Sequence, residues 1–154
     1  MQAKRRPDFF IIGVLAGIFS SLIRYLLGFS IIYFLPSYLN CVRIAACILL
    51  PPAQVMAGGF WVTAIGLQID MVVSVAVSLV TLFILEYSGF SHYLFKGAII
   101  GATTWSVFYV VLSRSLSQFP PVASILAIEL SFLVHIIYGM VLTWTIIRLK
   151  KAYS

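Results

Sequence analysis

The chain has 154 residues, of which 62% are hydrophobic and 9% charged, with a mean hydropathy of +1.11 and a formal net charge of +6. Soluble domains are about 45–50% apolar and about 25% charged, and a soluble domain of this length exposes too much surface to hide so many apolar side chains. The composition therefore excludes a soluble domain and predicts an all-α, polytopic membrane protein whose main partner is the lipid bilayer.

Basic residues gather at the two ends of the chain. They are Lys4, Arg5 and Arg6 at the start and Arg148, Lys150 and Lys151 at the end. Membrane proteins keep Lys and Arg in cytoplasmic segments, so this distribution predicts that both termini are cytoplasmic. The same charges can contact anionic lipid headgroups, and we expect no nucleic-acid partner.

The first predicted membrane span covers residues 9–35, because a crossing helix needs about 20 predominantly apolar residues. A basic start followed by an apolar run is also typical of a secretory signal. However, this run is far longer than the apolar core of a signal, which has about 7–15 residues. We therefore expect an uncleaved membrane anchor.

One face of this first span carries small residues and a single arginine, Arg24. At about 100° per residue, this face also holds Gly13, Gly17, Ser21 and Gly28. Small residues let helices approach closely in lipid, where no hydrophobic force drives helices together. We therefore predict that Gly13, Gly17 and Ser21 are packing positions and that Arg24 points into a helix bundle.

Residues 38–66 are apolar but interrupted by Pro51-Pro52 and by Gly58-Gly59. Proline breaks the helical hydrogen-bond ladder, and irregular backbone survives at membrane depth only beside protein or water. We predict two short helices that form an interfacial hairpin on the outer surface or dip into the membrane beside protein. A fifth span is the alternative, and it would put the two termini on opposite sides of the membrane.

Two aromatic residues, Phe60 and Trp61, follow the pair Gly58-Gly59. They are suited to the level of the lipid headgroups. Alternatively, they pack on a second copy of the chain, with the two glycines allowing close backbone approach. Because most oligomers are symmetric assemblies of one chain, we predict a homo-oligomer with these four residues at the contact.

The remaining three spans are predicted at residues 67–87, 94–112 and 122–147. The third span carries Gly97 and Gly101 at helical spacing, and the fourth carries Gly139 one turn after His135. These glycines are predicted to be packing positions, like those of the first span. The sequence thus predicts a single domain over residues 1–154, with four transmembrane helices and the interfacial hairpin.

An arginine in hydrocarbon costs about 2.5–3.5 kcal/mol on insertion scales, so Arg24 needs a partner. The depth of each acid follows from the helical rise of about 1.5 Å per residue. On this measure Glu129 is the acid closest in depth to Arg24, and it is the expected partner. Asp70 lies nearer the outer end of its span and His135 lies deeper, and both belong to the predicted intramembrane polar cluster.

Two interpretations of this cluster stay open: a polar clasp that fixes helix register, or an ion or proton site. A zinc site would need further ligands around His135, and the other histidine, His92, lies on the opposite side, so we expect no metal. At the cytoplasmic end, Lys96 is the expected partner of Glu86.

Enzymatic constellations are missing from the sequence. An intramembrane aspartyl peptidase needs two aspartates that share a site, and only Asp70 lies in the apolar region. There is no G-x-S-x-G motif. On one helix, Cys41 and Cys47 would be about 9 Å apart along the axis, too far for a disulfide. We expect no catalytic residues, no enzymatic activity and no cofactor.

Two stretches of sequence resemble known families. GIFSSLIRY (17–25) resembles the Gly-x-x-Gly-Ala-x-x-Arg-Tyr signature of small fluoride channels, with Ser20 and Ser21 in place of the Gly-Ala pair. GVLAG, FKGAIIGATTW, FPP and HIIYGMVL are together similar to small four-helix bacterial membrane proteins of the YqhR-like kind. The second resemblance implies four helices and a location in a bacterial cytoplasmic membrane.

These observations predict a non-enzymatic membrane protein, a self-associating scaffold or assembly subunit. The alternative is a small ion channel or transporter component that uses Arg24 to attract an anion. The sequence identifies no small-molecule or ion substrate for either role.

Overall fold

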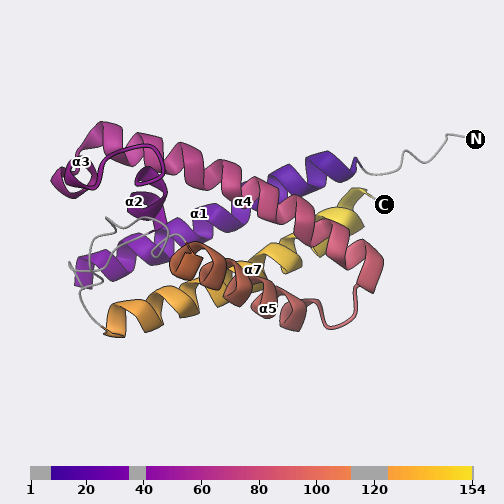
Figure 1. Cartoon of the computed structure of the whole chain (residues 1–154). Helices are drawn as coiled ribbons and strands as arrows, with labels where there is room; N and C mark the ends of the chain where they lie inside the picture. The colour runs from indigo at the N-terminus through magenta and orange to yellow at the C-terminus, as the bar shows by residue number, and fades with distance from the viewer. Residues whose placement is uncertain (1–7, 35–40, 112–124, 154) are drawn as a thin grey trace, which may run out of the picture.

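The computed structural model describes residues 8–34, 41–111 and 125–153, and the elements in these ranges are all helical (Figure 1). They are α1 (Phe9–Phe34), α2 (Cys41–Ala46), α3 (Pro52–Ala57), α4 (Phe60–Ser88), α5 (Tyr93–Trp105), the π-helix η1 (Ser106–Val111) and α7 (Ile125–Tyr153). No strand occurs in the described ranges. The predicted all-α class is therefore confirmed for this part of the chain.

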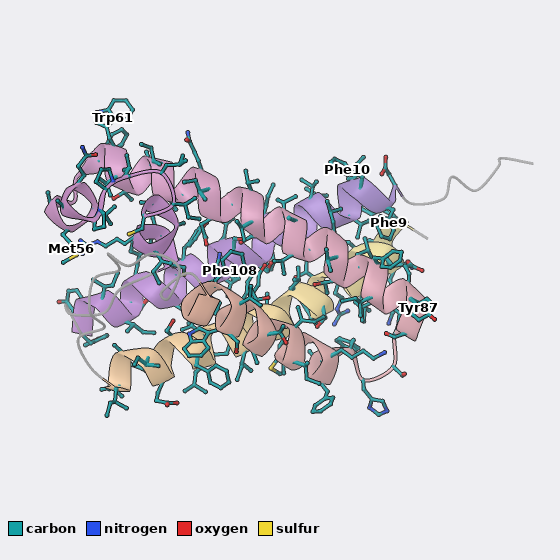
Figure 2. All side chains as sticks on the ribbon, in the orientation of Figure 1. Phe9, Phe10, Met56, Trp61, Tyr87 and Phe108 are labelled. Atoms are coloured by element: carbon teal, nitrogen blue, oxygen red, sulfur yellow. The ribbon has the colours of Figure 1, made fainter. Side chains whose placement is uncertain are left out.

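Within the described ranges, three helices are long and apolar enough to cross a membrane: α1 with 26 residues and α4 and α7 with 29 each. At about 1.5 Å per residue, each exceeds the hydrocarbon thickness of about 30 Å. Large apolar side chains such as Phe10 and Trp61 project outward from these helices (Figure 2). The chain is thus a multi-pass helical membrane protein whose outer surface suits lipid.

The long helices run back and forth along one axis, so that the start of α1 and the end of α7 lie at the same end of the bundle (Figure 1). Helix α1 packs against both α4 and α7, and α5 packs against α7, whereas α4 and α5 barely touch. The described helices therefore follow the order α4, α1, α7, α5 around the bundle, and no other described helix fills the side between α4 and α5.

An apolar core joins α1, α4 and α7 near the end where α1 begins. Its buried members are Ile12, Ala16, Leu82, Leu85, Tyr138, Leu142 and Ile146. Farther along α1 the interior becomes polar, and the buried hydroxyl groups bond to their own helix. Ser20 Oγ donates to the carbonyl of Ala16 at 2.7 Å, and Ser21 Oγ donates to that of Gly17 at 2.7 Å. Buried hydroxyls satisfied in this way let small polar residues line a helix contact.

The third predicted span, 94–112, corresponds to α5 and η1 together. Helix α5 has 13 residues, and η1 continues it without a break from Ser106 to Val111. A short π-helical stretch within a longer helix is a local change of hydrogen-bond register, often found at functional sites. Sequence periodicity gave no sign of this change.

The range 38–66 holds the two predicted short helices, but it does not end where we expected. Helix α4 begins at Phe60, directly after Gly59, so residues 60–66 belong to the membrane-length helix and its expected start at 67 is corrected. The break lies at the two glycines, whose φ values of 72° and 109° are in the left-handed region. After them nothing interrupts the helix, because an isolated glycine such as Gly66 is tolerated within one.

Helix α2 packs against α4, with four of its six residues buried. Gly66 makes this contact possible, because a side chain there would overlap the carbonyl group of Val42. Neither α2 nor α3, with six residues each, is long enough to cross a membrane. The last helix, predicted over 122–147, is described from Ile125 and continues to Tyr153; residues 122–124 lie outside the described ranges.

Candidate functional site

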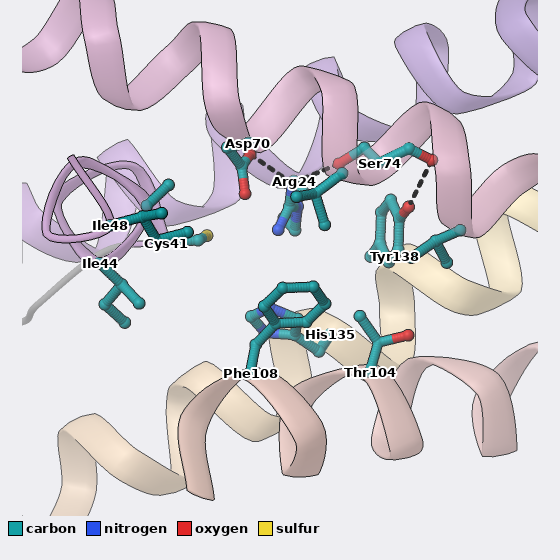
Figure 3. A pocket seen from close by; sticks show the side chains of 13 residues that line it. Arg24, Cys41, Ile44, Ile48, Asp70, Ser74, Thr104, Phe108, His135 and Tyr138 are labelled. Carbon is teal, nitrogen blue, oxygen red and sulfur yellow. Dashed lines mark hydrogen bonds and ion pairs between the residues drawn. The ribbon is translucent and has the colours of Figure 1, made fainter. Parts of the chain in front are cut away.

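The candidate site is centred on Arg24, whose residue is only 4% exposed in the middle of the bundle. Its Nη2 donates to Asp70 Oδ2 at 2.5 Å and to Ser74 Oγ at 2.8 Å (Figure 3). Asp70 and Ser74 are four residues apart on α4, so both side chains lie on the face that meets α1. A buried ion pair therefore joins α1 to α4.

Arg24 pairs with Asp70 rather than with Glu129, which corrects the expected pairing. Glu129 is exposed on α7; nine residues at about 100° each place it half a turn around the helix from the buried Tyr138. Asp70 lies deeper in the bundle than predicted, because α4 begins at Phe60 and not at residue 67. Both Arg24 and Asp70 are ten residues from the end of their helix on that side, or about 15 Å.

The small residues of α1 bring this helix close enough to α4 for the pair to form. An added Cβ on Gly17 would lie 2.9 Å from Val75 Cα, closer than side chains tolerate. One turn earlier, Ser78 Oγ donates to the carbonyl of Gly13 at 2.6 Å. The predicted packing positions Gly13 and Gly17 thus lie in the α1–α4 contact, while Ser21 is buried and bonds to its own helix.

Aromatic rings complete the surroundings of the guanidinium group. Arg24 Cζ lies 4.8 Å from the centroid of the Tyr138 ring on α7 and 5.5 Å from that of Tyr25. A cation over an aromatic face is attracted by the ring quadrupole. The hydroxyl group of Tyr138 in turn lies 3.5 Å from the carbonyl oxygen of Ser74, which connects α7 to the same cluster.

His135 lines the same cavity as Arg24, but it has its own partner. Its Nδ1 lies 2.8 Å from the carbonyl oxygen of Ser131, so this nitrogen carries the hydrogen and donates it. Ser131 Oγ accepts a further bond from Trp105 Nε1 at 3.2 Å. Among the described residues, no group of three or more potential metal ligands comes together. His135 is therefore placed as a hydrogen-bonded interior residue on α7.

A small cavity of about 30 Å³ adjoins the guanidinium group, with Cys41 of α2 and Phe108 of η1 in its walls (Figure 3). Arg24 Nε is buried and has no hydrogen-bond partner in the part of the chain that the structure describes. A water molecule needs about 10–15 Å³ of such space. The cavity therefore has room for two or three waters beside Arg24.

The glycines predicted as packing positions on the third and fourth spans meet each other between α5 and α7. A side chain at Gly101 would overlap the carbonyl group of His135, and side chains at Gly97 and Gly139 would each overlap the other's backbone. These two helices are therefore in backbone-to-backbone contact. The contact contains no ion pair among the described residues.

The residues predicted for a contact between copies lie at the end of the bundle that carries α2 and α3. Gly58 and Gly59 connect α3 to α4, and Phe60 and Trp61 are 76% and 75% exposed. The two aromatic rings contact each other edge to face, with centroids 5.2 Å apart. Within one chain, these aromatic side chains are thus free to meet lipid or a neighbouring protein.

At the opposite end, Glu86 pairs with Lys150 rather than with Lys96, which corrects the second expected pairing. Lys96 Nζ instead donates to the carbonyl of Ser88 at 3.0 Å and to that of Gly89 at 2.8 Å. A cation at the C-terminal end of a helix interacts favourably with the last carbonyl groups and the helix dipole. Lys96 therefore caps α4.

The sequence analysis missed Ser74, Ser78 and Tyr138 as members of the site. A signal for two of them was present, because Gly66, Asp70, Ser74 and Ser78 recur every four residues along α4. This is a small and polar stripe of the kind found on α1. Three of these four residues lie within the predicted span 67–87, so helical spacing alone was enough to identify the stripe.

Comparisons with known proteins add no assignment to this geometry. No family model matches the chain, and no curated protein and no solved structure matches it. The resemblances to YqhR-like proteins and to fluoride channels therefore stay expectations from sequence. Any functional conclusion rests on the buried ion pair, the cavity beside it and the packing of the helices.

Proposed function

We propose that this chain is a non-enzymatic membrane protein that serves as a scaffold or assembly subunit. The observation that carries this proposal is the buried contact of Arg24 with Asp70 and Ser74. It uses the charge in the centre of the bundle to hold two helices together. A helix bundle whose helices are fixed relative to one another presents the same outer surface to neighbouring proteins at all times, as a scaffold requires.

The proposal includes four membrane crossings, with α5 and η1 as the third. Their continuous helical stretch from Tyr93 to Val111 is close to the length of about 20 residues that a crossing needs. An even number of crossings agrees with the shared end of the bundle where α1 begins and α7 ends (Figure 1). Arg148, Lys150 and Lys151 at the end of α7 favour a cytoplasmic position for that end, and so for both termini, in a bacterial membrane.

A channel or transporter component is the second candidate, and one observation favours it. Arg24 lines a cavity, and its Nε has no partner among the described residues, so an anion there could accept its hydrogen. Against this role, Asp70 neutralises the arginine, and a cavity of about 30 Å³ offers room for only two or three waters. We therefore rank the scaffold first.

Ion flux distinguishes the two candidates most directly. Purified protein is placed in sealed liposomes, and anion efflux is measured for the native chain and for Arg24→Ala. A scaffold leaves efflux at the level of protein-free liposomes for both chains. Anion-selective efflux that Arg24→Ala abolishes would refute the scaffold and establish the channel.

Self-association is part of the proposed scaffold role, with the exposed Phe60 and Trp61 at the contact. The mass of the detergent-solubilised complex, measured by light scattering with the detergent subtracted, is expected to exceed one protomer of 17.1 kDa. Trp61→Ser should then lower this mass, whereas Phe10→Ser, at an exposed aromatic position of the opposite end, should not. A single protomer across several mild detergents would contradict self-association.

A further inference from the structure

An open groove runs between α4 and α5, on the side of the bundle where these two helices barely touch. It has a volume of about 640 Å³, within the range of about 300–1,000 Å³ that small-molecule sites occupy. Its walls include Val80, Ile84, Ile99, Ile100 and Thr103. The groove is therefore an apolar site of ligand size, and its open side faces lipid.

Two threonine hydroxyl groups at the groove, those of Thr81 and Thr104, add little polarity to it because they are bonded within their own helices. Thr81 Oγ1 donates to the carbonyl of Val77 at 2.7 Å, and Thr104 Oγ1 donates to that of Ile100 at 2.8 Å. No hydrogen of these hydroxyls is left to demand a polar ligand. The groove wall thus presents hydrocarbon and favours a hydrocarbon chain as its occupant.

The length of the groove corresponds to one leaflet of the membrane. Along α4 its lining runs from Ala76 to Ser88, twelve residues or about 18 Å. The hydrocarbon core of a bilayer is about 30 Å thick, so one leaflet contributes about 15 Å. A membrane-spanning helix from another protein would extend far beyond this groove, whereas one acyl chain matches it.

A positive charge lies where the groove reaches the end of α4. Lys96 lines the groove, and its Nζ is fixed by two carbonyl groups and by Ser88 Oγ, all of them uncharged. Glu86, an acid near this end, is paired with Lys150. Lysine binds phosphate as a point charge, so Lys96 can attract a headgroup phosphate without giving up these bonds.

From these observations we propose that the groove between α4 and α5 is a binding site for one anionic phospholipid. One acyl chain lies between Ile84 and Ile99, and the headgroup phosphate lies beside Lys96. This inference goes beyond the proposed scaffold role and holds for a channel as well, because it rests only on the groove and on membrane insertion.

The test compares phosphatidylglycerol with phosphatidylcholine of identical acyl chains. Each lipid is titrated into delipidated protein, and bound lipid is counted by native mass spectrometry. One phosphatidylglycerol should bind at least about fivefold more tightly than phosphatidylcholine, the effect expected of one basic residue near an anionic headgroup. Lys96→Gln should remove this preference, whereas Lys151→Gln, at the same end but outside the groove, should keep it.

A second variant tests the position of the acyl chain. Ile99→Trp fills the groove and should abolish the tight site for both lipids. Leu133→Trp is the matched control, because Leu133 on α7 is as exposed as Ile99, at 51%, and lies outside the groove. Equal affinities for the two lipids, or tight binding that survives in Ile99→Trp, would overturn the proposal. If Ile99→Trp lowered the oligomer mass but left lipid binding unchanged, the proposal would be overturned, because the groove would then be a contact with a second copy of the chain.

Discussion

The α1–α4 contact and the α5–α7 contact hold two pairs of helices by different means. Between α1 and α4, small residues admit a buried ion pair and a hydroxyl bond between the helices. Between α5 and α7, glycines bring the two backbones together, and the bond from Trp105 Nε1 to Ser131 Oγ crosses the contact, but no ion pair of the described residues does. The same sequence feature, a stripe of small residues, thus supports two kinds of stabilisation in lipid.

This difference predicts how each contact fails. The α1–α4 contact depends on charge, so it should respond to loss of an ionised partner even when volume is kept. The α5–α7 contact depends on shape, so it should respond to the addition of a single carbon atom. Free energies of unfolding, measured by SDS titration in mixed micelles, report both responses.

Loss of the acid at the α1–α4 contact should have the largest effect. Asp70→Leu leaves the guanidinium of Arg24 buried without its counter-charge, and it should cost about 3–5 kcal/mol of unfolding free energy. The matched control is Glu129→Leu, because Glu129 is exposed on α7 and its replacement should change stability by less than about 0.5 kcal/mol. If the two variants lost equal unfolding free energy, Asp70 would not be the specific partner of Arg24.

The addition of one carbon at the α5–α7 contact should have the next largest effect. The new side chain of Gly101→Ala overlaps the carbonyl of His135, and overpacking of this kind costs about 1–3 kcal/mol. Gly28→Ala is the control, since no described residue beyond the backbone of its own helix lies within 4 Å of the added Cβ. The control should be neutral or slightly stabilising, because alanine favours helix more than glycine. If both variants were equally stable, backbone contact would not hold α5 to α7.

The hydroxyl bond at the α1–α4 contact should contribute least. Ser78→Ala removes the donor to the carbonyl of Gly13, and bonds between membrane helices are worth about 0.6 kcal/mol on average. Ser30→Ala serves as the control, because Ser30 Oγ donates to Leu26 of its own helix and should cost less. A larger loss for Ser30→Ala would mean that Ser78 contributes nothing between the helices.

Much of the fold could be predicted from sequence because lipid imposes a simple rule. A run of about 20 apolar residues must be helical, and helix α1, described over Phe9–Phe34, lies within the first predicted span of 9–35. The stripe around Arg24 followed from helical periodicity alone. The burial of Arg24 could also be predicted, because exposing an arginine to lipid costs free energy.

The partner of Arg24 could not be predicted, because one boundary was misplaced. The sequence interpretation puts Gly58-Gly59 inside a surface hairpin, so the second span is predicted to begin at residue 67 instead of Phe60. Asp70 is then only three residues from the predicted start of its span, too near the membrane surface to pair with Arg24. The position of Phe108 in the cavity wall and the contact of α2 with Gly66 could not be predicted from sequence, for a different reason. They depend on how separate helices pack, and local sequence does not encode that packing on its own.

A double-mutant cycle on Arg24 and Asp70 tests the central claim, that this pair holds α1 to α4. Arg24→Leu should cost less than Asp70→Leu, because a buried carboxyl group can become neutral by binding a proton, whereas guanidinium stays charged. The double variant should be more stable than Asp70→Leu alone, since it leaves no unpaired charge. Losses that add to within about 0.5 kcal/mol would contradict the account, because they would show that the two residues do not interact.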